Sequence, residues 1–362
     1  MLIKSIKLQN YRNYEHLNIV FDHNINVFYG DNGQGKTNIL EALFLSGTTK
    51  SHRGTKDKDL IQFGFEEAHL EIVIEKNNLE YVIDMHLKKN TSKGIAINKV
   101  SLQKASDLFG IGCFVFFSPE DLNIIKAGPT VRRRFMDLEL SQLDCVYLSY
   151  LLHYNKIINQ RNTLLKNINI NHNWMDTLDV WDLQLIEYGN KIMYIRNKFI
   201  LNINKIISNI HKKLTNDKEE LKIIYEKSIG KNTLEESLKK NREKDIRFKS
   251  TSVGPHRDDL FFISNGINLR QFGSQGQQRT AALSLKLAEL ELAKELTQDT
   301  PVLLLDDVLS ELDKHRQNCL LESIKDIQTM ITCTGLDEFV SHSFGINKKF
   351  QVINGKVYIG GL

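Results

Sequence analysis

Short apolar runs near both ends of the 362-residue chain predict β-strands. Side chains alternate between the two faces of a sheet, so a strand shows alternating apolar residues or, when both faces are buried, a continuous apolar run. The segments with such a pattern are residues 2–8, 16–21, 26–30, 69–74, 81–87, 113–117, 302–307 and 329–334. Helical patterns separate the last of them, which is typical of an α/β fold.

The middle of the chain has a helical pattern instead. All four prolines lie outside residues 130–254, so this interval holds few residues that would break a helix. Apolar residues recur there at spacings of three and four, as on one face of a helix, and Arg161 stands at a place where an apolar residue is expected. The two series are Leu143, Tyr147, Tyr150, Tyr154, Ile157 and Leu164, then Trp181, Leu185, Tyr188, Ile192, Ile195 and Phe199.

Two long consecutive helices predict an antiparallel helical arm. A helix over 141–167 would be roughly 40 Å long, at about 1.5 Å per residue. The alternative is a pair of amphipathic helices within a compact domain. We favour an α/β head that is split by an inserted arm, with residues 1–125 and 250–362 in the head and 126–249 in the arm.

Residues 30–37, GDNGQGKT, form a phosphate-loop motif between a predicted strand and a predicted helix. The glycines let the backbone wrap closely, so that amide groups face phosphate oxygens. Lys36 would neutralise the β- and γ-phosphates, and the Thr37 hydroxyl would bind Mg²⁺. The predicted nucleotide contacts in this motif are Gly30, Asp31, Asn32, Gly33, Gln34, Gly35, Lys36 and Thr37.

The apolar strand PVLLLDD ends in two aspartates, Asp306 and Asp307. A carboxylate at the tip of a strand beside a phosphate loop can hold Mg²⁺, and we assign this role to Asp306. Asp307 would polarise the attacking water as the catalytic base. The alternative is a strand end that carries two solvated acids.

A polar turn, GSQGQQ at residues 273–278, precedes a third long helical pattern. Ser274 and Gln277 have the spacing of a capping box, which would account for the turn structurally. A cap alone does not require Gly276, Gln275 or Gln278. An exposed helix start with a serine hydroxyl and a glycine is also a site for an anion such as a phosphate.

Composition narrows the class of protein only slightly. Hydrophobic residues make up 41% and charged residues 25%, as in globular proteins, and the formal net charge is +4. The four cysteines are scattered, which predicts neither a metal site nor a disulfide framework. Since we find no apolar run as long as a signal peptide core or a membrane span, we expect a cytoplasmic protein.

Two basic stretches are candidates for binding DNA. One is Arg132, Arg133 and Arg134, and the other is residues 239–249, which begin with Lys239 and Lys240. In an antiparallel arm both stretches would return to its base and bind backbone phosphates without sequence preference. Such charge runs are also typical of a solvated face.

Taken together, these motifs resemble the RecF family, bacterial replication and repair proteins in the SMC-like branch of ABC-type ATPases. The residues that carry the resemblance, besides GDNGQGKT and LLLDD, are NYRNY (10–14), SHRG (51–54), FFSPEDL (116–122), GPTVRRRFMD (128–137), VGPHRDDL (253–260) and FGSQGQQRTAALSLKLAEL (272–290). They span nearly the whole chain and are least marked over 160–245.

The resemblance implies an ATP- and Mg²⁺-dependent homodimer. Ser274 and Gly276, with Gln275 beside them, would contact the γ-phosphate of ATP bound to the other copy. Arg12 and Asn13 would touch the nucleotide. Arg53 would be a regulatory arginine or a surface residue. The cluster of His256, Arg257 and Asp258 would be structural, would position the turn at residues 273–278, or would touch DNA.

The implied function is slow, DNA-stimulated ATP hydrolysis that serves mainly as a dimerisation switch. Asp307 is one methylene shorter than the usual glutamate, and Thr332, Cys333 and Thr334 stand near the place of the transporter switch histidine. Duplex, gapped or single-stranded DNA and RecO- and RecR-like mediator proteins are the implied partners, in a nucleoid-associated protein. The alternatives are a transporter ATPase subunit, a non-hydrolysing interaction protein and, less favoured, a small-molecule kinase.

Overall fold

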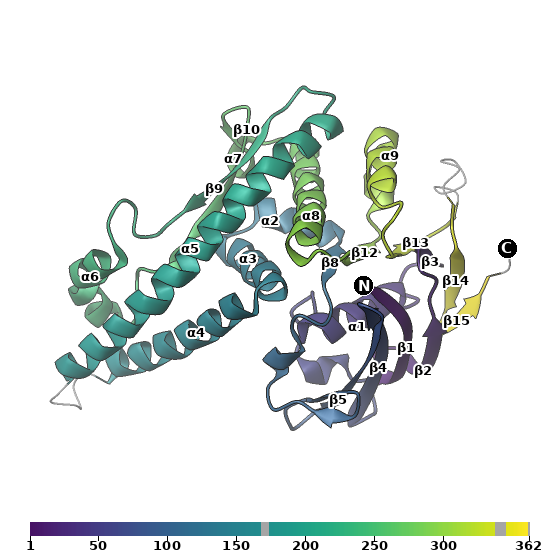
Figure 1. Cartoon of the computed structure of the whole chain (residues 1–362), viewed down its shortest axis with the longest axis horizontal. Helices are drawn as coiled ribbons and strands as arrows, with labels where there is room; N and C mark the ends of the chain where they lie inside the picture. The colour runs from purple at the N-terminus through teal and green to yellow at the C-terminus, as the bar shows by residue number, and fades with distance from the viewer. Residues whose placement is uncertain (168–173, 337–344, 361–362) are drawn as a thin grey trace. The chain divides into compact units, whose positions relative to one another are not determined.

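The computed structural model describes residues 1–167, 174–336 and 345–360. The chain divides into two compact units (Figure 1). The first combines Met1–Asp121 with Ser284–Leu362, and the second is Leu122–Leu283. The α/β fold class is confirmed, and the segment inserted into the first unit contains the long helices. None of the helices in these ranges is long and apolar enough to cross a membrane.

The first unit contains an antiparallel sheet in the order β2-β1-β4-β5-β6-β7. Its strands are β1 (Leu2–Tyr11), β2 (Tyr14–Val20), β4 (Glu67–Lys76), β5 (Leu79–Lys88), β6 (Gly94–Ile97) and β7 (Val100–Ser101). Burial alternates along β4, where Ala68, Leu70 and Ile72 are buried and the residues between them face outward. The sheet therefore has one apolar face and one polar face.

A second, mixed sheet of this unit has the order β15-β14-β3-β13-β12-β8. Its strands are β3 (Ile25–Tyr29), β8 (Phe114–Phe117), β12 (Val302–Asp306), β13 (Thr329–Cys333), β14 (Lys348–Ile353) and β15 (Lys356–Ile359). All of its pairs are parallel except β14 with β15. Helix α1 (Lys36–Thr48) is almost wholly buried because it packs against strands of both sheets. All the strands predicted from the sequence are present.

The carboxyl ends of β3 and β12 lie at the same edge of this sheet, because both strands are parallel to β13. The phosphate loop leaves β3 at this edge, and Asp306 is the last residue of β12. Ligand sites of open α/β sheets lie at such an edge. Helix α9 (Lys314–Ser323) follows β12 and is capped by Asp313, whose carboxylate accepts a hydrogen bond from the Arg316 amide.

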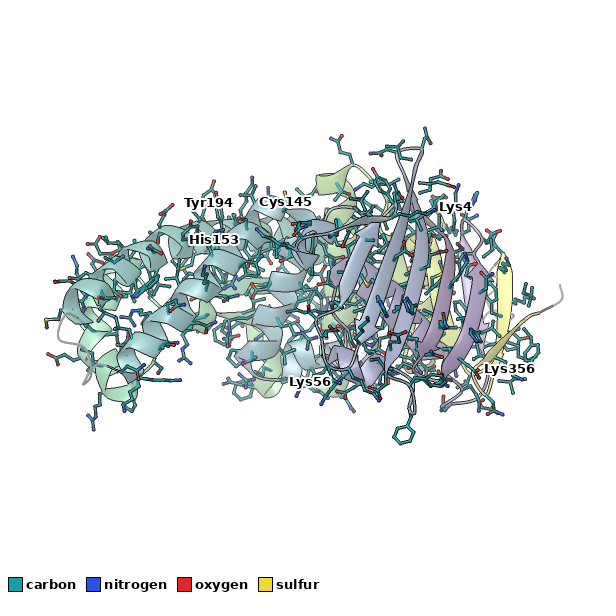
Figure 2. All side chains as sticks on the ribbon, turned by 90° about the horizontal axis from the view of Figure 1, so that it is seen from below. Lys4, Lys56, Cys145, His153, Tyr194 and Lys356 are labelled. Atoms are coloured by element: carbon teal, nitrogen blue, oxygen red, sulfur yellow. The ribbon has the colours of Figure 1, made fainter. Side chains whose placement is uncertain are left out.

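The second unit is built on two long helices that pack against each other, α4 (Cys145–Lys166) and α5 (Trp174–Leu214). They lie side by side in Figure 1 and form the predicted arm. At about 1.5 Å per residue, the 41 residues of α5 span roughly 60 Å. Exposed side chains such as Cys145 and Tyr194 stand along these helices (Figure 2).

Shorter elements complete the second unit. They are α2 (Leu122–Lys126), α3 (Pro129–Leu143), β9 (Leu221–Glu226), α6 (Leu234–Phe248), β10 (Asp259–Ser264), β11 (Ile267–Asn268), α7 (Leu269–Phe272) and the start of α8 (Gln275–Thr297). The helix expected over 141–167 is two helices, because Asp144 caps α4 by accepting hydrogen bonds from the Val146 and Tyr147 amides.

The second unit differs from the predicted arm in two respects. Strand β9 lies within residues 126–249, where only helix was expected. Strand β10 pairs with β9, so the packing places residues 250–283 in the second unit, although the sequence assigned them to the head. The short alternation of β9 was hidden within a long helical interval, and its pairing with β10 leaves no trace in local periodicity.

Arg161 interrupts the apolar pattern of α4 because it is held by carboxylates inside the unit. Its side chain is fully buried; Nε lies 2.6 Å from Asp182 of α5, and Nη1 lies 2.8 Å from Asp245 of α6. Arg196 of α5 is buried in the same manner and donates to the Asp137 carboxylate at 2.6 Å. Buried charges are tolerated only when they are paired and hydrogen-bonded, so these arginines tie the helices together.

Candidate functional site

The phosphate loop is shaped by three glycines with positive φ: Gly30 (147°), Gly33 (79°) and Gly35 (112°). A Cβ atom at Gly30 would lie 2.4 Å from the Val352 carbonyl oxygen, and one at Gly35 would lie 2.3 Å from the Asn13 side chain. Other residues are therefore excluded at these two positions by both conformation and space. The exposed residues Asp31 and Asn32 stand between the first two glycines.

Lys36 lies across the loop. Its ammonium group donates to the carbonyl oxygens of Gly30 at 2.6 Å and Asp31 at 2.8 Å. Burial lowers the pKa of Lys36, and the nearby Asp307 and Asp306 oppose this shift. A partly buried cation held over backbone carbonyls is placed to receive a phosphate anion.

Thr37 and Asp306 meet, although 269 residues separate them. The Thr37 hydroxyl donates to the Asp306 carboxylate at 2.7 Å, and so does the Thr332 hydroxyl of β13, also at 2.7 Å. Burial raises the pKa of Asp306, against these two hydrogen bonds. A desolvated carboxylate next to a threonine hydroxyl has the donor set that Mg²⁺ requires, and a bound cation would favour its ionised form.

Asp307 has a left-handed backbone, with a φ of 53°. Its amide donates to the Thr332 hydroxyl at 2.9 Å, so one hydroxyl joins the carboxylate of Asp306 to the backbone of Asp307. Conformations of this kind are uncommon outside glycine and cluster at functional sites. The sequence analysis noted Thr332 only because it stands near the place of the transporter switch histidine. It did not predict that the Thr332 hydroxyl would connect Asp306 to Asp307.

Arg12 is occupied by an ion pair that the sequence did not predict. Its Nε and Nη2 atoms donate to both carboxylate oxygens of Glu41 in α1, at 2.8 and 2.9 Å. The Glu41 side chain is fully buried and also accepts a hydrogen bond from Ser51. The pair therefore fixes Arg12 to the phosphate-loop helix, and a direct nucleotide contact by Arg12 stays a prediction.

Asn13 braces the phosphate loop. Its Nδ2 donates to the Gln34 carbonyl at 2.8 Å, and its Oδ1 accepts from the Asn38 side chain at 2.9 Å.

Arg53 is exposed, and its positive charge lowers the pKa of Asp306, so it is within electrostatic reach of the proposed metal site.

The serine turn of the second unit has the capping box that its sequence predicted. The Ser274 amide donates to Gln277 Oε1 at 2.9 Å and the Gln277 amide donates to Ser274 Oγ at 3.2 Å, which is a complete capping box. Gln278 is buried and donates to the Leu269 carbonyl at 2.7 Å. Ser274, Gln275 and Gly276 are exposed, so the start of α8 is open to an anion.

Comparison with known proteins finds matches that cover nearly the whole chain. A family model described as an AAA domain matches residues 5–332. The DNA replication and repair protein RecF of Agathobacter rectalis is 58% identical over 359 residues, which cover 99% of both chains. The RecF protein of Clostridium perfringens is 46% identical over 362 residues, again 99% of both chains. The chain belongs to the RecF family.

Solved structures agree with this RecF assignment. A structure of the recombination mediator protein RecF-ATP in the RecFOR pathway superimposes with a TM-score of 0.93 at 36% identity, covering 99% of this chain and 98% of that one. An Smc head domain from Pyrococcus furiosus matches with a TM-score of 0.58 at 17% identity, which shows a shared fold alone. The predicted SMC-like head is thereby confirmed.

The predicted DNA contacts of this RecF-family chain require a correction at Arg132. Its side chain is 1% exposed, and Nε and Nη2 donate to the Asp259 carboxylate at 2.6 and 2.9 Å. Such a pair is not available to DNA phosphates, so the prediction is wrong for Arg132. Arg133 is partly buried and donates to the Asp258 carbonyl at 2.9 Å, whereas Arg134 is exposed.

Lys239 and Lys240 are exposed on α6, but they are not at the base of the arm where the sequence placed them. Ion pairs join α6 to the end of the arm at which α4 ends and α5 begins: Arg242 binds Asp179 and Asp182, and Asp245 binds Arg161 (Figure 1). The two basic stretches are therefore not brought together. DNA binding by Arg134, Lys239 and Lys240 stays a prediction.

His256 and Asp258 have structural partners, whereas Arg257 is exposed, so positioning of the serine turn or DNA contact by this group stays a prediction. His256 Nδ1 lies 2.8 Å from the Tyr154 hydroxyl and Nε2 lies 3.1 Å from the Thr251 carbonyl. Asp258 is fully buried and accepts hydrogen bonds from the Tyr225 hydroxyl and the Ser228 amide. The cluster thus links α4 to the segments that flank β9 and β10.

Acid should destabilise the helical unit through His256. Burial lowers the pKa of His256 from 6.5 to about 4, so the unfolded chain binds the extra proton between these values. Stability from the neutral imidazole is thus complete above pH 6.5 and is lost as the pH falls towards 4, by at most about 3 kcal/mol. We expect His256→Gln to flatten the pH dependence of urea unfolding over this range, whereas His153→Gln, at an exposed position on α4, should leave it unchanged.

Proposed function

We propose that this chain is an ATP-dependent DNA-binding protein of recombinational repair, in which ATP joins two copies on DNA and hydrolysis separates them. The observation that carries the proposal is the meeting of Thr37 with Asp306 at the mouth of a glycine-shaped phosphate loop. The RecF relatives are replication and repair proteins, and the structure of one relative is described as RecF-ATP.

The residues present fit ATP with Mg²⁺. Loop amides from Gly30 to Gly35 and the Lys36 ammonium would hold the phosphates, while Thr37 and Asp306 would hold the cation. Bound Mg²⁺ neutralises phosphate charge and orients the terminal phosphate. Asn13 supports the loop backbone and Arg12 is tied to Glu41 in the loop's helix, and from these positions both would also touch the nucleotide.

The dimer is proposed from the serine turn. The exposed start of α8 offers the Ser274 hydroxyl and free helix amides, and Gly276 has open space around its Cα. Such a helix start favours an anion through its dipole and its unpaired amides. The γ-phosphate of ATP held by a second copy is the anion that an SMC-like head would present there, giving two composite sites.

Turnover is proposed to be slow and stimulated by DNA. Asp307, rather than a longer glutamate, is the base that would activate water, and Thr332, Cys333 and Thr334 stand near the place of the transporter switch histidine. ATP would then act mainly as a switch for dimerisation. RecO- and RecR-like mediators and duplex, gapped or single-stranded DNA are the proposed partners, with Arg134, Lys239 and Lys240 as candidate phosphate contacts.

Sedimentation velocity tests the proposal. Wild-type protein should sediment as a monomer without nucleotide and as a dimer with ATP and Mg²⁺, and the dimer should retain short duplex DNA. Ser274→Arg replaces the hydroxyl at the exposed helix start with a large side chain, so it should bind ATP and stay monomeric.

A matched control separates dimerisation from helix capping. Thr233 closes the capping box of α6 with Glu236, so Thr233→Arg breaks a similar cap with the same change in charge. This variant should dimerise like wild type. If wild type binds ATP and stays monomeric with or without DNA, the proposed function is wrong; if both variants fail equally, Ser274 is only a cap.

A further inference from the structure

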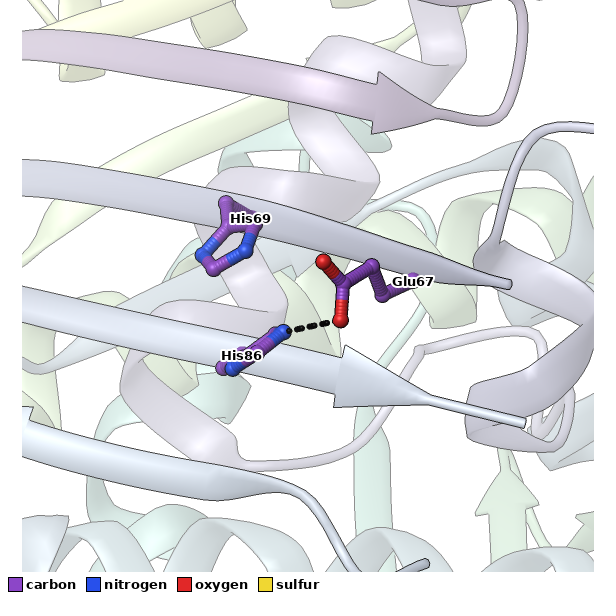
Figure 3. A group of neighbouring side chains, drawn as sticks. All are labelled: Glu67, His69 and His86. Atoms are coloured by element: carbon purple, nitrogen blue, oxygen red, sulfur yellow. Dashed lines mark hydrogen bonds and ion pairs between the residues drawn. The ribbon is translucent and has the colours of Figure 1, made fainter. Parts of the chain in front are cut away.

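Two histidines and a glutamate stand together on the outward face of the antiparallel sheet. Glu67 and His69 are two residues apart on β4, so their side chains point to the same face. His86 lies on β5 directly opposite His69 in the strand register. Figure 3 shows the three side chains grouped over the two strands. These positions are fixed by the sheet rather than by a loop.

The distances within the group suit one shared ion. Each residue offers a ligand atom, and these atoms all lie within 4.8 Å of one another. His86 Nε2 is 3.0 Å from Glu67 Oε2, and the rings of His69 and His86 stack with centroids 3.8 Å apart. Across the described parts of the chain, no other set of three histidine, cysteine or acidic side chains meets this criterion.

The surroundings leave room for a bound ion. Both histidines line a shallow hollow of about 700 Å³ on this face, together with Lys7, His16, Glu71 and Asp84.

We propose that Glu67, His69 and His86 bind one divalent cation of the zinc class, with water completing its coordination. Two imidazoles and a carboxylate are a donor set that zinc uses when an open position remains. With metal–ligand distances of about 2.0–2.1 Å, the donor atoms of a tetrahedral site lie roughly 3.4 Å apart. Small rotations of these side chains would close the remaining distance. The site is separate from the phosphate loop, which leaves β3 in the other sheet.

Titration of the purified full-length chain with Co²⁺, without nucleotide, tests the site. Co²⁺ replaces zinc and shows weak visible bands with nitrogen and oxygen ligands, whereas thiolate ligands such as Cys145 would add strong near-ultraviolet bands. We expect one equivalent to bind without thiolate bands, and Zn²⁺ to displace it. His69→Gln, His86→Gln and Glu67→Gln should each weaken binding by at least about tenfold.

Two further variants control the measurement. His16 faces the same hollow but lies two strands from His69, roughly 10 Å away, so His16→Gln should bind like wild type. Lys88 Nζ is 4.0 Å from Glu67 Oε2, so Lys88→Gln should tighten binding a few fold by removing a positive charge. Absence of binding by wild type, or equal loss in His16→Gln and His69→Gln, would overturn the proposal.

Discussion

Replacing Asp307 by asparagine is expected to reduce ATP turnover by about a hundredfold or more while ATP still binds. The change removes the proposed base but keeps its size, and asparagine tolerates the left-handed conformation that Asp307 adopts. The hydrogen bond that the backbone amide of residue 307 donates to the Thr332 hydroxyl can persist. Phosphate release measured with DNA present, alongside nucleotide binding by calorimetry, separates the two effects.

Asp326→Asn provides the matched control. Asp326 is an exposed aspartate in the turn before β13, at the opposite end of that strand from the site. Its neutralisation should leave turnover unchanged, since it changes only the net charge. If Asp307→Asn hydrolyses ATP at the wild-type rate, Asp307 is not the base, although the dimerisation proposed for Ser274 would be untouched.

Arg161→Ala is expected to destabilise the helical unit by about 3–5 kcal/mol. The guanidinium group is fully buried between Asp182 and Asp245, and Asp245 is itself 0% exposed. Asp182 keeps its ion pair with Arg242, so Asp245 would lose its arginine. Both tryptophans of the chain lie in α5, so urea unfolding followed by their fluorescence reports on this unit.

Two variants check the cause of this loss. Lys166→Ala removes an exposed cation from the same helix and should change stability by less than about 0.5 kcal/mol. Adding Asp245→Asn to Arg161→Ala should recover part of the loss, because the stranded negative charge is removed. A loss below about 1 kcal/mol in Arg161→Ala would show that the buried ion pairs do not hold the arm together.

The phosphate loop and its acidic partner could be predicted because their geometry is local or follows from the sheet. Gly30 to Thr37 form one continuous motif, and parallel strands bring their carboxyl ends to one edge. That rule alone brings Asp306 to Thr37 across 269 residues. The capping box at Ser274 and Gln277 was readable for the same reason, since both partners lie within one turn of helix.

The sequence did not predict the buried ion pairs between residues that lie far apart along the chain. Arg132 looked like a surface cation, but its partner Asp259 is 127 residues away, and Arg161 meets Asp245 across 84 residues. The periodicity of apolar residues does not indicate which residues form such ion pairs. Strand β9 did leave a signal, since Leu221 and Ile223 alternate with exposed residues, but it was hidden within a long helical interval.

The buried arginines of the arm also limit how its sequence can change by descent. A single mutation at Arg161 would leave its carboxylate partner unbalanced, so a lineage would pass through an unstable intermediate before Asp245 could follow. Exposed positions such as Lys239 face no such barrier and can drift one at a time. We therefore expect the buried residues Arg132, Arg161 and Arg196 each to be inherited together with its carboxylate partners, while the surface of the arm diverges around them.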